Sequence, residues 1–254
     1  MEIIDSHCHL NHQAFDLDRQ DIIKRAITNN VSIFIVPGTV SSQWQSLIEL
    51  AEIQQSIRFS LGLHPYYINQ HSDDDLTKLV KLLNNTDAIA IGEIGLDFYD
   101  KNLDPIKQLR YFDAQLKIAQ ELKLPVIIHA RKSYDEIIKS LNKISFNQGG
   151  IIHAFNGSIQ HAMKLIEMNF KLGFGGMLTF EHSTKLRKLA TSLPIESIVL
   201  ETDAPDMTGA NHKGQRNSPE YLPEVLNVLS NLRNESIELI AETTTNNVKS
   251  VLHL

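Results

Sequence analysis

The feature that most constrains the fold is an alternation of short apolar runs, rich in β-branched residues, with amphipathic segments. The runs cover residues 2–5, 31–36, 58–63, 88–92, 125–129, 150–153, 171–174 and 197–201. They are almost continuously apolar, as strands of a parallel sheet are when both faces are buried. Helical patterns follow them at residues 18–29, 43–55, 76–83, 105–122, 133–141, 159–168, 184–193, 223–232 and 236–251.

Eight strand candidates alternating with helices predict an α/β fold, a (β/α)₈ TIM-type barrel. The alternative is a doubly wound open sheet, which usually carries a glycine-rich phosphate-binding turn after its first strand. Here His7, Cys8 and His9 follow the first strand instead. Because the chain shows no internal repeat and no linker, we expect residues 1–254 to form one barrel domain, with residues 205–219 as a loop over its mouth.

Composition restricts the classes of function. Cys8 is the single cysteine, which excludes an intramolecular disulfide and fits a reducing compartment, so we expect a cytoplasmic protein. No apolar stretch approaches the length of a membrane span, and no membrane association is expected. The net charge of −6 argues against a broad basic groove for duplex DNA. Nothing in the sequence indicates an obligate protein partner.

Metal-binding side chains recur where the predicted strands end. His7 and His9 are two residues apart, so they point to the same side of the first strand. In a (β/α)₈ barrel the carboxyl ends of all strands share one rim, where the active site lies. Groups scattered over two hundred positions would therefore meet at one place; they are His7, His9, His64, Glu93, His129, His153 and Asp203.

Apart from His64, the set contains four imidazoles and two carboxylates, which suit Zn²⁺, Mn²⁺ or a similar divalent ion and are too many for one open site. The sequence therefore predicts two ions, whether Zn, Mn or Mg, with the Glu93 carboxylate shared between them. The predicted ligands of the first ion are His7, His9, Glu93 and Asp203, and those of the second are Glu93, His129 and His153. Such a pair can activate water for hydrolysis.

Three further residues are assigned supporting parts. We expect His64 to contact substrate, with a simple capping role before Pro65 as the alternative. Arg131 follows His129 by two residues and would suit phosphate recognition, the alternative being a salt bridge to the next helix. Glu201 should point inward beside Asp203, where it would either support a ligand or make a hydrogen bond in the core.

Several short motifs resemble the TatD family of metal-dependent hydrolases, within the broader group of amidohydrolase-like barrels. The resemblance runs nearly end to end. It implies a barrel, a requirement for divalent metal and, for several members, deoxyribonuclease activity; some relatives are implicated in removing D-amino acids from tRNA. The motifs are DSHCHL at 5–10, GLHP at 62–65, GEIGLD at 92–97, PVIIHAR at 125–131, HAFNG at 153–157 and ETDAP at 201–205.

The expected activity is hydrolysis of a phosphodiester, at nucleic-acid ends or in small nucleic-acid pieces, by a metal-bound hydroxide. Asp203 would act as ligand and general base, and Glu93 would hold both ions. An amidohydrolase or esterase acting on a small molecule or on D-aminoacyl-tRNA could use the same chemistry. A binding protein with a structural metal is disfavoured, because structural sites are usually closed and rich in cysteine.

Overall fold

The computed structural model describes residues 2–254 and contains one eight-stranded parallel sheet whose strands are ordered as in the chain. The strands are β1 (Ile3–Asp5), β2 (Val31–Pro37), β3 (Ile57–Leu61), β4 (Ala90–Asp97), β5 (Val126–Arg131), β6 (Gly150–Ile152), β7 (Phe170–Phe174) and β8 (Ile198–Leu200). The helices are α1 (Arg19–Thr28), α2 (Trp44–Ile53), α3 (Asp73–Leu83), α4 (Pro105–Leu122), α5 (Tyr134–Ile144), α6 (Ile159–Glu167), α7 (Thr184–Ser192), α8 (Leu222–Arg233) and α9 (Ile237–Leu252).

The two ends of the sheet meet. The Ser6 N–H donates to the Leu200 carbonyl at 2.9 Å, and the Asp203 N–H donates to the His7 carbonyl at 2.9 Å. The buried Asp5 carboxylate adds a second connection, because it accepts the Thr202 N–H at 3.0 Å and the Thr202 hydroxyl at 2.6 Å. The predicted (β/α)₈ barrel is therefore confirmed, and the open sheet is not formed.

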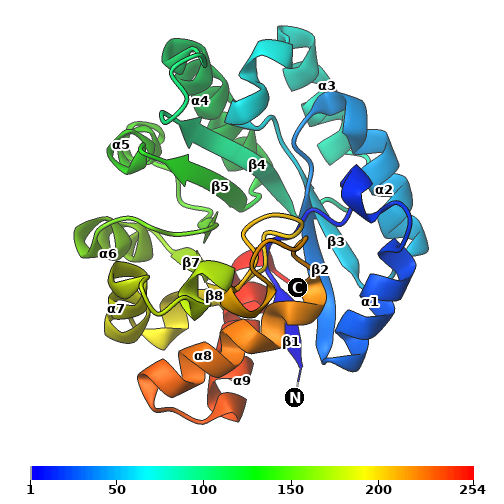
Figure 1. The fold of residues 1–254 in the computed structure, drawn as a ribbon. Helices are drawn as coiled ribbons and strands as arrows, with labels where there is room; N and C mark the ends of the chain where they lie inside the picture. The colour runs from blue at the N-terminus through cyan, green and yellow to red at the C-terminus, as the bar shows by residue number, and fades with distance from the viewer. Residues whose placement is uncertain (1) are drawn as a thin grey trace.

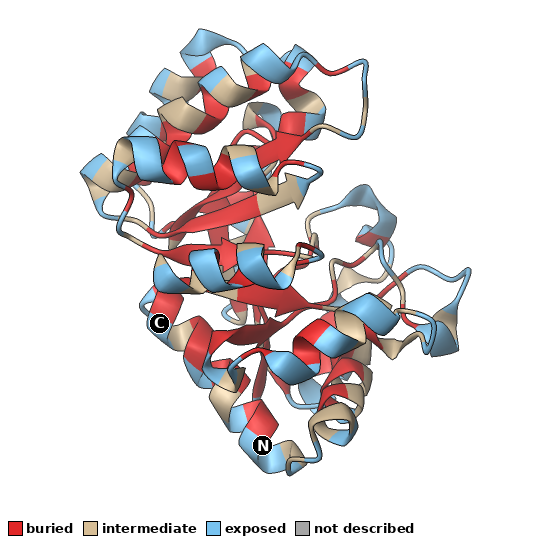
Figure 2. Cartoon of the chain, turned by 90° about the vertical axis from the view of Figure 1, so that its left-hand side faces the viewer, coloured by how far each residue is buried: buried red, intermediate tan, exposed pale blue. Residues whose placement is uncertain are grey.

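The helices surround the strands, with their exposed faces outward and the strands buried (Figures 1 and 2). Most of the core lies between the sheet and this helical layer. A smaller cluster fills the barrel interior, where it is built from alternate residues of the strands and from one face of α9. Its buried members are Ile4, Ile35, Ala90, Ile127, Ile151, Val199, Val248, Val251 and Leu252.

Strand β4 extends five residues beyond the predicted end at Gly92. The extension pairs with β5, with Ile94 opposite Ile128, Gly95 opposite His129 and Asp97 opposite Arg131. Glu93 consequently lies within a strand and not after one. It sits between Ile91 and Ile94, where the pairing with β5 shifts register, and its N–H donates to the Gly38 carbonyl at 2.9 Å. In contrast, β6 ends at Ile152, one residue before His153.

None of the helices in the described part of the chain is long and apolar enough to cross a bilayer.

The close approach of β4 to β5 generates a prediction. Gly95 has a φ of +143°, and a Cβ there would collide with the His129 carbonyl oxygen. We expect Gly95→Ala to lower the free energy of unfolding by about 3 kcal/mol, from backbone strain plus overpacking. Gly214→Ala is the matched control: its φ is +81° but its Cβ would meet nothing within 4 Å, so about 1 kcal/mol is expected. Urea denaturation measures both, and equal losses would contradict the steric argument.

Candidate metal centre

The first pair of imidazoles follows β1. His7 and His9 bring their Nε2 atoms to 3.3 Å from each other, while Cys8 is buried in the core on the opposite side. The Asp5 carboxylate accepts the backbone N–H of His7 at 3.3 Å and so holds the turn that presents both rings. His7 is fully buried and the His9 side chain is 20 % exposed, which places one ring in the floor and the other at the opening.

Two carboxylates face this pair. Glu93 Oε2 lies 3.3 Å from His7 Nε2 and 3.6 Å from His9 Nε2. Asp203 Oδ1 lies 3.5 Å from each of the same two nitrogens. The four residues predicted for the first ion therefore converge, from β1, β4 and the segment after β8.

The other oxygen of Glu93 faces a different group of imidazoles. Glu93 Oε1 lies 2.9 Å from His153 Nε2, 3.0 Å from His64 Nε2 and 3.3 Å from His129 Nδ1. His129 Nδ1 is also 3.1 Å from His153 Nε2. The structure brings together the residues predicted for the second ion, and it adds His64, which was expected to contact substrate, at the same distance as the predicted ligands.

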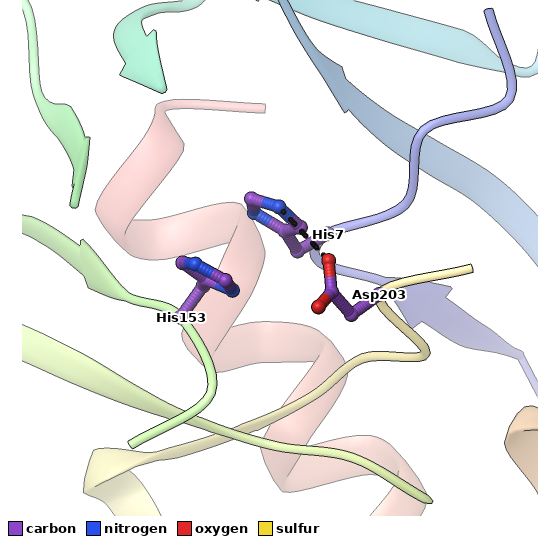
Figure 3. Close-up of side chains that lie close together, drawn as sticks. All are labelled: His7, His153 and Asp203. Atoms are coloured by element: carbon purple, nitrogen blue, oxygen red, sulfur yellow. Dashed lines mark ion pairs between the residues drawn. The ribbon is translucent and has the colours of Figure 1, made fainter. Parts of the chain in front are cut away.

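Within residues 2–254, three groups of donors are close enough to hold an ion, each with its donor atoms within 4.8 Å of one another. One of them combines residues that the sequence had assigned to different ions: the rings of His7 and His153 stack at 4.0 Å beside Asp203 (Figure 3). The three groups are His7, His153 and Asp203; His7, His9 and Glu93; and His64, Glu93 and His129.

The donor set fits divalent cations. Ligand atoms about 2.0–2.1 Å from one tetrahedral ion lie roughly 3.3–3.4 Å apart. The donor separations here run from 2.9 to 3.6 Å, on both sides of that value. The Nδ1 atoms of His7 and His153 are buried and have no hydrogen-bond partner within residues 2–254, so only the Nε2 side of each ring faces the carboxylates. Cations bound between these imidazoles and the two carboxylates would explain why the side chains are packed so closely.

The electrostatics favour the protonation states that ligands need. Burial opposes ionisation of Glu93, but the surrounding rings of His64, His153 and His7 hold its pKa well below the usual value. Burial, reinforced by the neighbouring His153, lowers the pKa of His7 to about 4. At neutral pH the Glu93 carboxylate is therefore charged and the His7 imidazole is neutral.

His129 differs from His7 because it has a second acidic neighbour. Burial works to lower its pKa, but hydrogen bonds to Asp97 and Glu93 outweigh burial and raise it to about 9. Asp97 Oδ2 lies 3.3 Å from His129 Nε2, while its Oδ1 accepts the Tyr99 N–H at 2.9 Å. A carboxylate on the far nitrogen of a ligand fixes the orientation of the ring.

The sequence pattern predicted no role for Asp97, although a signal was present. Glu93 and Asp97 are four residues apart on one strand, so their side chains share a face. Asp97 also contacts Arg131, whose guanidinium nitrogen lies 3.9 Å away and whose Cζ lies 3.8 Å from the centroid of the Tyr99 ring. Arg131 therefore pairs with a strand residue at the edge of the site, and the salt bridge to the following helix is not formed.

Glu201 contacts no candidate ligand side chain directly. It is buried, and its Oε1 accepts the Ala154 N–H at 2.5 Å, which anchors the segment that begins with His153. Burial, with the nearby Asp203 charge, raises the pKa of Glu201 well above its usual value. Of the two roles expected for it, the structure shows the hydrogen bond.

The comparisons with known proteins agree with this geometry. Residues 4–253 match the family model for TatD related DNase. The chain is 36 % identical to the metal-dependent hydrolase YjjV of Escherichia coli K12, covering 99 % of this chain and 98 % of that one. It is 32 % identical to the metal-dependent hydrolase YabD of Bacillus subtilis, covering 99 % of each. The crystal structure of YjjV, described as a TatD homologue, superposes with a TM-score of 0.96 at 35 % identity, covering 99 % of this chain and 98 % of that one.

The rim of the barrel carries imidazoles and carboxylates that fit divalent cations. Metal-dependent hydrolases match the chain over its whole length. The chain belongs to the TatD family, and it is a metal-dependent hydrolase.

Proposed function

We propose that this hydrolase uses two divalent ions to cleave phosphodiester bonds at nucleic-acid ends or in small nucleic-acid pieces. The observation that carries the proposal is the division of the Glu93 carboxylate: one oxygen faces His7 and His9, and the other faces His64, His129 and His153. One carboxylate between two sets of imidazoles is the arrangement expected for a two-metal hydrolytic site. The family model, described as TatD related DNase, supports the nucleic-acid substrate.

Divalent ions bound by these residues would polarise a phosphoryl oxygen and acidify water. The protein supplies the proton acceptor. Burial opposes ionisation of Asp203, but the neighbouring His9, His153 and His7 lower its pKa, so the carboxylate is ionised at neutral pH. Its side chain remains 14 % exposed, so solvent reaches it. Asp203 can therefore take the proton of the attacking water.

Arg131 supplies the binding group for the substrate phosphate. Its side chain is about half exposed and is held by Asp97 and by the ring of Tyr99 at the edge of the centre. A planar guanidinium with free donors can bind two phosphate oxygens at once. His64, buried against Glu93, is assigned to the inner side of the centre, as a ligand or as a contact to the reacting phosphoryl group.

A substrate panel tests the proposed function. The metal-loaded protein is offered single-stranded DNA, bis-p-nitrophenyl phosphate, small amides and D-aminoacyl-tRNA. We expect phosphodiester cleavage that is lost with EDTA and in Glu93→Gln, because the shared carboxylate is then neutral. Glu121→Gln, an exposed substitution on α4, is the matched control and should retain activity. Turnover of amides or aminoacyl esters without phosphodiester cleavage would reject the phosphodiesterase assignment.

The proton acceptor is tested by Asp203→Asn, which keeps the shape of the side chain and removes its basicity. We expect kcat to fall by about 10²–10⁴-fold. Asp206→Asn, an exposed change three residues later, should leave kcat within a few-fold. Metal content, measured by plasma emission spectrometry, shows whether Asp203→Asn also loses an ion. A kcat close to that of the unmodified protein with full metal content would exclude Asp203 as the base.

Metal binding should depend on pH through His129. Its pKa of about 9 lies above the ordinary value of 6.5, so the ring is protonated at neutral pH in the metal-free protein. Binding at this ring must displace the proton, and affinity should therefore rise as the pH approaches that pKa. His7, with a pKa of about 4, is already neutral and adds no such dependence.

Titration calorimetry of the metal, in buffers with different ionisation enthalpies, measures the released proton. Asp97→Asn removes the charge that helps to raise the pKa of His129, so less proton release is expected at neutral pH. The same release in both proteins would contradict this explanation.

A further inference from the structure

A hollow of about 360 Å³ lies beside the metal centre and takes no part in it. Its walls come from three segments at the carboxyl ends of neighbouring strands: the segment after β6, the end of β7 with the start of α7, and the loop after β8. Ala154 in its lining directly follows His153, and Met207 is four residues beyond Asp203. A ligand group bound in this hollow would therefore be directly attached to the part of the ligand that is cleaved at the metal centre.

The accessible walls are apolar. Phe155 and Phe174 are each only 1 % exposed and lie beneath the surface, so Met177, Leu186 and Met207 form the apolar surface that a ligand can reach. Thioether sulfurs make favourable contacts with aromatic rings, so this surface favours a flat π system over an aliphatic chain. The volume falls in the lower part of the range for small-molecule sites, about 300–1,000 Å³. The hollow therefore suits one planar ring with a small substituent.

The opening is polar and free of acidic groups. His182, Thr184 and Lys185 lie there, and no carboxylate from the described residues lines the hollow. The Lys185 ammonium donates to the Asn156 carbonyl at 2.7 Å, which holds the positive charge at the edge of the hollow. Although the whole chain has a net charge of −6, the lining of this hollow would not repel an anionic group of the ligand.

Two other hollows differ in charge. One is lined by Glu220 and Glu224 with His212, and another by Glu52 and Asp87 with Arg58, so carboxylates outnumber basic side chains in both. A phosphate-linked ligand is therefore less favoured there than beside Lys185, where no carboxylate of the described residues lines the hollow. The hollow beside the centre is also at the end of β7, a place where barrel enzymes commonly receive a phosphate group.

We infer that this hollow is the nucleoside subsite, which takes the base and sugar attached to the phosphodiester that is cleaved. The inference rests on the proposed phosphodiesterase function. It adds a binding site through which the enzyme would distinguish a nucleotide from a simple phosphate diester. The base lies against the Met177, Leu186 and Met207 side chains, and Lys185 faces the next phosphate along the strand.

Two chromogenic esters with the same leaving group test the subsite. Thymidine 5′-(p-nitrophenyl phosphate) carries a nucleoside, whereas bis-p-nitrophenyl phosphate does not. Met177→Trp fills the hollow, and Met163→Trp places the same side chain on the exposed face of α6 as the matched control. We expect kcat/KM for the thymidine ester to fall about tenfold or more in Met177→Trp, with bis-p-nitrophenyl phosphate within twofold and Met163→Trp unchanged.

A binding measurement separates the subsite from the chemistry. Thymidine 5′-monophosphate is titrated into the metal-free protein, and binding should weaken at least fivefold in Met177→Trp and in Lys185→Ala but not in Lys188→Ala, which is exposed on the same helix outside the hollow. Equal loss of both esters in Met177→Trp, or no effect on either ester, overturns the subsite.

The two proposals fail in different ways. If the unmodified protein hydrolyses neither ester but its affinity for the nucleotide still depends on Met177, the phosphodiesterase assignment fails and the subsite stands. If it hydrolyses both esters with equal kcat/KM and binds no nucleotide, the phosphodiesterase assignment stands and the subsite fails.

Discussion

A single carboxylate, buried among imidazoles, holds this structure's functional centre together. Isolated burial of Glu93 would be costly, because a charge removed from water loses its hydration. The surrounding rings instead lower its pKa, so the charge stays in place. The same arrangement requires cations, since the nitrogens that approach Glu93 also approach one another and cannot all donate protons to it.

The barrel makes this arrangement possible by rigidity. Glu93 lies inside the long strand β4, and the pairing of Gly95 with His129 sets the separation of the two central strands. His7 and Asp203 are brought together where the ends of the sheet meet, through hydrogen bonds that join β1 to the segment after β8. Glu93 and His129 are thus held within strands, whereas His7, His153 and Asp203 lie just beyond strand ends and are held there by hydrogen bonds.

The rim divides into two regions by charge and polarity. On one side, Asp97 holds both His129 and Arg131, so one carboxylate orients a ligand and the cation that would meet a phosphate. On the other side, the hollow after β6 and β7 is apolar with Lys185 at its edge. The proposed nucleotide substrate would use both regions, with its phosphate at the metal centre and its ring in the hollow beside it.

The sequence by itself determined the barrel and indicated the strand ends from which the candidate metal ligands come, because both depend on local sequence patterns. Apolar runs followed by histidine or a carboxylate are visible in one dimension, and the shared rim of a barrel converts their order into proximity. What only the tertiary structure decided are the partners. His153 stacks on His7, His64 reaches Glu93, and Asp97 supports His129, since these contacts depend on strand register and side-chain direction across β4, β5 and β6. The position of α9 against the barrel interior was equally invisible, because its apolar face reads like that of any outer helix, and tertiary packing alone places it beneath the strands.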